Sequence, residues 1–132
     1  MSLSILTALL LATQSAPPAT ASDASPIPYS EAKRQADADE VSVTGQAHED
    51  MLSSQGALLD AGIAACARDD LRDDFTPFTI VMKLSKTGMV QQTWRQGTSP
   101  LGICLQRYVR DKTVFTPPRD GFFMSFEVSF TK

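Results

Sequence analysis

The sequence predicts an α+β domain: a three-stranded antiparallel sheet with two helices packed on one face, ordered helix-strand-strand-helix-strand. Three observations predict this class. Two segments carry apolar residues at helical spacing, three alternate apolar and polar residues, and turn or break signals separate them. The chain has 132 residues, of which 42% are apolar and 20% charged. That is enough for one small domain with a modest core.

The folded domain is expected to span residues 56–132, and its first helix begins near Gly56. Leu58, Leu59 and Ile63 fall on one side of this helix at spacings of three and four residues. The helix ends by Leu71, beside an acidic run made of Asp69, Asp70, Asp73 and Asp74. We interpret the run as a solvated loop. The alternative is a cation site, but the run lacks the glycine spacing of a calcium loop.

A strand hairpin follows. Phe78–Leu84 alternates apolar residues with more solvent-exposed ones and is the first predicted strand. Ser85–Gly88 supplies a turn whose glycine is expected at positive φ. Met89–Gln96 is the returning strand, with Val90 and Trp94 on one face.

The second helix and the last strand have clear start signals. Ser99 is an N-cap and Pro100 occupies the first helical position, ahead of an apolar stripe that reaches Val109. Thr116–Gly121 breaks the chain. The strict alternation over Phe122–Thr131 predicts the third strand.

Residues 1–21 are predicted to be a signal peptide. The apolar run Ile5–Ala12 is too short to span a bilayer, so no stable membrane anchor is expected. Ala19–Ala21 is a small-residue cleavage motif, which predicts cleavage after Ala21 and a periplasmic or secreted protein. No basic residue precedes the run, and the alternative is a buried N-terminal helix.

Residues 22–55 are predicted to be an acidic, disordered leader. Residues 22–74 hold four basic and twelve acidic residues, a balance of −8, whereas residues 75–132 hold eight basic and three acidic, a balance of +5. The leader has one aromatic residue and few large apolar ones, so it should not offset its own ordering entropy. The net charge of −3 argues against a nucleic-acid partner.

Cys66 and Cys104 are the only cysteines, and each lies on the apolar side of a predicted helix. An oxidising compartment favours a disulfide between them. Such a bridge would stabilise the fold by about 4 kcal/mol on the chain-entropy model. Two buried free thiols are the alternative, and the spacing suits neither a redox pair nor a zinc site.

The sequence offers no catalytic signature. His48 is the only histidine and lies in the predicted leader, where a general base would lack fixed geometry. Nucleophile, zinc-protease and phosphate-binding motifs do not occur. We therefore expect no enzyme, no metal site and no cofactor.

From Leu58 to Phe130 the chain resembles the C-terminal domain of TonB-type proteins, in the periplasmic subset with a cysteine in each helix. The resemblance rests on the hairpin FTIVMKLSKTGMV, the Pro-Pro-x-x-Gly break that begins at Pro117 and a final F-x-x-F-x-V-x-F strand. It implies a module that adds an extended peptide of a cell-envelope protein to a sheet edge. The long Pro-rich spacer and uncleaved membrane helix of energy-transmitting members are not seen.

The resemblance places the partner-binding edge on the last strand, at Phe123, Ser125, Glu127 and Ser129. Separately, the basic residues Arg95, Arg107 and Arg110 would attract an acidic partner; the alternative is that they serve only solubility. Sheet extension would also allow a homodimer. The alternative function is a secreted or periplasmic inhibitor or immunity-type protein that blocks a partner enzyme or toxin through its loops.

Overall fold

The computed structural model describes residues 26–67 and 74–130. The predicted signal peptide, its cleavage site after Ala21 and most of the acidic run lie outside these residues. Among the described helices, none combines the length and the apolar character that crossing a membrane requires.

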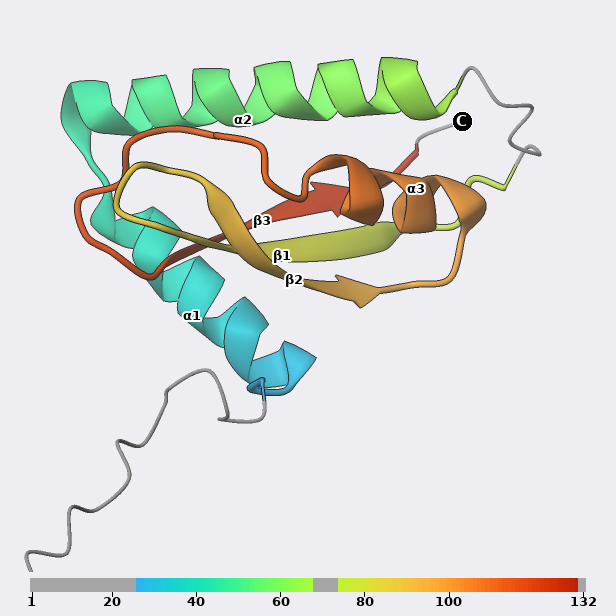
Figure 1. Cartoon of the computed structure of the whole chain (residues 1–132), viewed down its shortest axis with the longest axis horizontal. Helices are drawn as coiled ribbons and strands as arrows, with labels where there is room; N and C mark the ends of the chain where they lie inside the picture. The colour runs from blue at the N-terminus through green and yellow to red at the C-terminus, as the bar shows by residue number, and fades with distance from the viewer. Residues whose placement is uncertain (1–25, 68–73, 131–132) are drawn as a thin grey trace, which may run out of the picture.

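The described chain forms three helices and three strands (Figure 1): α1 (Tyr29–Ser42), α2 (Gly45–Cys66), β1 (Phe78–Leu84), β2 (Val90–Gln96), α3 (Pro100–Tyr108) and β3 (Phe122–Val128). The strands form one antiparallel sheet in the order β2-β1-β3. The α+β class and the three predicted strands are thus confirmed, while an additional helix, α1, precedes the predicted elements.

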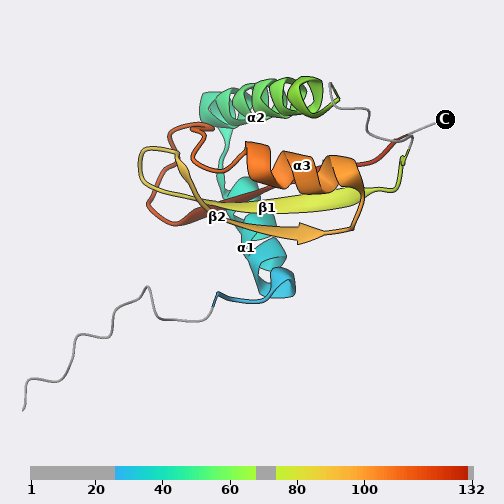
Figure 2. The same ribbon diagram turned by 45° about the vertical axis from the view of Figure 1, so that its right-hand side comes forward.

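Two layers of helix enclose the sheet. Helices α2 and α3 lie on one face and α1 lies on the other (Figure 2). The face beneath α2 and α3 holds the larger core, because alternate residues of β1 and β3 point toward it. Its largest buried side chains are Met51, Ile80, Met82, Leu84, Leu105, Phe122 and Met124.

Helix α1 corrects the predicted boundary of the domain. Residues 22–55 are expected to be a disordered leader, whereas the structure has α1 and the first half of α2 there. Ala32 and Ala36 of α1 are fully buried against Val81 and Phe123 of the sheet. Because alanine side chains are small, the helix approaches the sheet closely, and a face with little apolar surface still packs well.

A change of register in β2 separates two residues that the sequence places on one face. Lys83 pairs with Gln92 but Leu84 pairs with Val90, which leaves one extra residue in β2. Val90 joins the core beneath α2 and α3. Trp94 packs on the α1 side, and its Nε1 donates a hydrogen bond to a backbone carbonyl just before α1. The prediction of a shared face is wrong because alternation alone cannot reveal a bulge.

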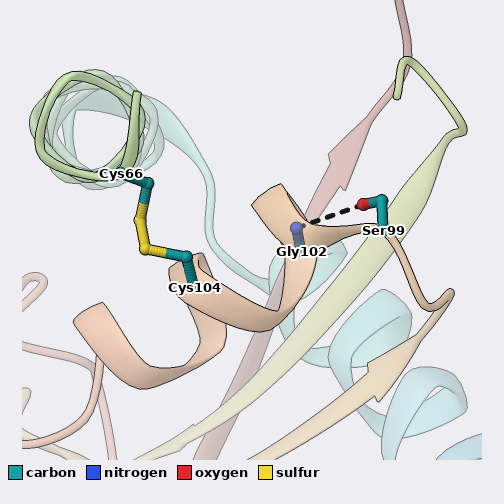
Figure 3. Close-up of a disulfide and its surroundings, with 4 residues drawn as sticks. All are labelled: Cys66, Ser99, Gly102 and Cys104. Carbon is teal, nitrogen blue, oxygen red and sulfur yellow. Dashed lines mark hydrogen bonds between the residues drawn. A yellow bond between two sulfur atoms is a disulfide. The ribbon is translucent and has the colours of Figure 1, made fainter. Parts of the chain in front are cut away.

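The start of α3 and the disulfide follow the sequence prediction (Figure 3). The Ser99 hydroxyl accepts a hydrogen bond from the Gly102 N–H at 3.2 Å, and Pro100 is the first helical residue. Cys66 and Cys104 form a disulfide that joins the end of α2 to α3. The bridge ties together the two helices that cover the larger core.

Replacing both cysteines by alanine should lower the free energy of unfolding by about 4 kcal/mol, because the bridge joins residues 38 positions apart and restricts the unfolded chain. Urea denaturation of the oxidised protein and the variant measures this difference. A loss below about 1 kcal/mol would contradict the bridge's role as a main support of the fold.

Two glycines of α2 should respond in opposite ways to alanine. A Cβ at Gly56 would meet nothing within 4 Å, so Gly56→Ala should stabilise the protein by up to about 1 kcal/mol through helix propensity. A Cβ at Gly62 would lie 2.9 Å from Cδ1 of Tyr108 and closer still to the Leu105 side chain. Gly62→Ala should therefore cost roughly 1–3 kcal/mol. Equal effects in chemical denaturation would contradict the close packing of α2 on α3.

Candidate partner-binding site

The sheet has two outer strands, β3 and β2, and their edges differ. On β3, the N–H groups of Phe123 and Ser125 point away from β1, toward α1. Alternation along the strand turns the backbone of Glu127 the same way. Unpaired edge groups of this kind can accept a further strand. This is the edge that the sequence resemblance assigns to the partner.

Side chains of α1 and α2 already occupy this edge. Oδ2 of Asp39 accepts a hydrogen bond from Phe123 N at 2.8 Å, and Oε1 of Glu40 accepts one from Ser125 N at 3.0 Å. Nε2 of Gln55 donates to the Ser125 carbonyl at 2.5 Å and to Glu40 Oε1 at 3.1 Å. These bonds replace those that a neighbouring strand would form, so this stretch of the edge is closed.

Ion pairs hold α1 in place at both ends of this contact. Arg119 pairs with Asp39, and Lys33 pairs with both Asp37 and Glu127. Burial acts to lower the pKa of Lys33, but hydrogen bonds to Asp37 and Glu127 outweigh it and raise that pKa. The helix therefore meets β3 through a connected set of charges as well as through its alanines.

The predicted edge residues have unequal surroundings. The Phe123 side chain is 5% exposed, and Ser125 is buried as well. Glu127 is exposed and pairs with Lys33, whereas Ser129 is exposed beyond the end of β3. The structure therefore places α1 where the sequence resemblance places a partner peptide.

Sequence reasoning missed Asp39, Glu40 and Gln55, which close the edge. Their partners on β3 lie 84, 85 and 70 residues further along the chain. No local sequence pattern predicts contacts between residues so far apart in the chain. The one signal is a pair of adjacent carboxylates near the end of a segment whose apolar face is alanine.

The edge of β2 is open over most of its length. At its start, Val90 N donates to the Lys112 carbonyl at 2.8 Å. In an antiparallel sheet, successive residues direct their backbone N–H and C=O groups to alternate sides of the strand. Because those of Phe123 and Ser125 face away from β1, the strand pairing also directs those of Thr93 and Arg95 away from β1, at this opposite edge. Within residues 26–67 and 74–130, no backbone group bonds to those outward groups.

Basic side chains lie on this side of the molecule. Arg95 is on β2, Arg107 is exposed in the last turn of α3, and Arg110 follows that helix. Arg110 and Asp111 line a pocket of about 300 Å³ beside residues 90–93 of β2. The residues predicted to attract an acidic partner are therefore associated with β2 and α3 and not with the predicted β3 edge.

Comparisons with known proteins add no assignment, since no family model, curated protein or solved structure matches the chain. In the part of the chain that the structure describes, no three His, Cys, Asp or Glu side chains gather closely enough to hold a metal ion. His48 lies on α2 beside a groove, and not in a disordered leader.

The buried carboxylate that closes the β3 edge should make stability depend on pH. Burial raises the pKa of the Glu40 carboxyl, although hydrogen bonds from Ser125 and Gln55 act to lower it. The folded state therefore holds this proton more tightly than the unfolded state. Stability should fall as the pH rises from 4.5, the unfolded value, through the folded pKa.

Glu40→Gln keeps an oxygen that can accept from Ser125 and removes the ionisation. Relative to the wild type, the variant should gain stability as the pH rises through this window and show no gain below it. Urea denaturation between about pH 4 and about pH 7 tests this. Glu49→Gln, an exposed carboxylate of α2, is the control and should keep the wild-type profile. Identical profiles for wild type and Glu40→Gln would contradict the prediction.

Proposed function

We propose that the chain is a non-enzymatic binding module that adds an extended segment of a partner protein to the free edge of β2. One observation carries this proposal: the side chains of Asp39, Glu40 and Gln55 close the β3 edge, whereas the outward backbone groups of Thr93 and Arg95 have no backbone partner in the described chain. An added strand would satisfy those groups, which is how extended peptides gain affinity at sheet edges.

The charges around β2 favour a segment with acidic side chains. Arg95, Arg107 and Arg110 are supplied by β2, by α3 and by the residues after α3. Attraction of this kind accelerates association and selects the partner more than it raises affinity. Asp111 also borders the pocket, and the Arg95 guanidinium already donates to Gln106 and to the Gly97 carbonyl, so the preference for acidic side chains should be modest.

We further propose that the protein works in the periplasm or outside the cell, on a partner of the cell envelope. The Cys66–Cys104 disulfide supports an oxidising compartment, and the signal-like residues 1–21 support export. The resemblance to TonB C-terminal domains stays a prediction and implies the same class of partner. The open β2 edge would also be the place where two copies extend their sheets into a dimer.

The test uses short acidic peptides selected from a random peptide library against the oxidised protein. Thr93→Pro removes one outward N–H and leaves the ladder with β1 intact, because an edge strand tolerates proline at such a position. Thr93→Val is the matched control: it keeps the N–H and loses the same hydrogen bond between the Thr93 hydroxyl and Gln106. Thr93→Pro should weaken binding by at least about tenfold, and Thr93→Val by much less.

The peptide side of the interface gives a second readout. N-methylation of alternate peptide amides should abolish binding, while methylation of the amides between them should be tolerated, because only every second N–H faces the sheet. Equal losses with the proline and valine variants, or a binding footprint on residues 86–88 and 117–121, would reject strand addition. The loop footprint would instead favour the inhibitor function.

A further inference from the structure

A second concave surface lies on the opposite side of the sheet from β2, in the groove between α1 and α2. The groove has a volume of about 470 Å³, and the β3 edge at Ser125 and Glu127 forms its floor. Its walls come from the second half of α1 and the first half of α2. This is within the usual range for a site that binds a small molecule or a pair of side chains.

The groove has apolar walls that are left exposed. Val41 of α1 is 79% exposed and Leu52 of α2 is 46% exposed. Met51, beneath them, is 1% exposed and belongs to the core. Val41 and Leu52 therefore offer apolar surface to an occupant without being needed by the protein's own core.

The groove also carries an excess of negative charge. Three carboxylates line it, those of Asp37, Glu40 and Glu127. In the described chain, Lys33 is the one cation that pairs with any of them, and it is shared between Asp37 and Glu127. Glu40 receives its hydrogen bonds from the neutral donors Gln55 and Ser125. Three negative groups thus face a single positive one.

We propose that this groove binds a short cationic and apolar segment of a partner protein, in which a Lys or Arg side chain lies next to one of the size of Leu. The apolar side chain would lie between Val41 and Leu52, and the cation would reach the carboxylates of Glu40 and Glu127. The site is independent of the proposed β2 site and has the opposite charge preference. The protein would then engage partner segments at both edges of its sheet.

The experiment measures the binding of a short fluorescent peptide of alternating leucine and lysine to the oxidised protein by anisotropy. A leucine–glutamate peptide of equal length is the charge-reversed probe and should bind at least about tenfold more weakly. Leu52→Ser should weaken binding of the leucine–lysine peptide by at least about fivefold. Asp37→Asn should weaken it by about threefold or more, and added salt should reduce that difference.

Each variant has a matched control that leaves the groove unchanged. Met89→Ser removes an apolar side chain that is 43% exposed at the β1–β2 turn, and Asp60→Asn removes an exposed carboxylate near the far end of α2. Both controls should bind the peptide within about twofold of wild type. Circular dichroism should show that all four variants remain folded.

Three outcomes would overturn the proposal. The first is binding of the leucine–lysine peptide no tighter than that of the leucine–glutamate peptide. The second is a loss of affinity in the controls as large as in the groove variants. The third is a dimer in sedimentation that Leu52→Ser dissociates while the peptide fails to bind, in which case a second copy of the chain is the occupant. None of these results depends on the β2 edge, so the two sites are tested separately.

Discussion

The outward-facing backbone groups of β3 need hydrogen-bond partners, and the carboxylates of Asp39 and Glu40 supply them. This requirement fixes the position of α1, because the helix has to present both residues to the strand. The chain then crosses between Ser42 and Gly45 to the opposite face, where α2 begins and Gln55 reaches back to the same edge. Helix α1, the crossing and α2 together enclose β3, and β2 is left as the free edge.

Helix α1 is held on the sheet by polar contacts and by apolar burial together. Helix α1 buries mainly Ala32 and Ala36, which add little apolar area. Hydrogen bonds that involve a charged group contribute roughly 1.5–3 kcal/mol each. For Glu40 the cost of burying the carboxylate outweighs the hydrogen bonds to its charged form, as its raised pKa indicates. The position of α1 therefore depends on satisfying the strand edge as well as on covering Val81 and Phe123 of the sheet.

Local patterns predicted the parts of the fold that local physics determines. Alternation located β1 and β3, Ser99 and Pro100 marked the start of α3, and the placement of both cysteines on apolar helix faces predicted their bridge. The sequence did not reveal α1, since a helix face made only of alanine buries little apolar area. Its close packing becomes evident only with the sheet that it contacts. Long-range hydrogen bonds such as that from Phe123 N to Asp39 follow no periodic pattern in the sequence. Because these bonds close the β3 edge, the candidate binding edge is β2 and not the predicted β3.

The central claim is that one edge of the sheet is closed from within and the other is open. Amide hydrogen exchange of the oxidised protein, resolved by residue, tests this most directly. The account predicts slow exchange at Phe123 and Ser125, whose N–H groups bond to Asp39 and Glu40, and fast exchange at Thr93 and Arg95. Exchange at Phe123 and Ser125 as fast as at Thr93 and Arg95 would contradict it.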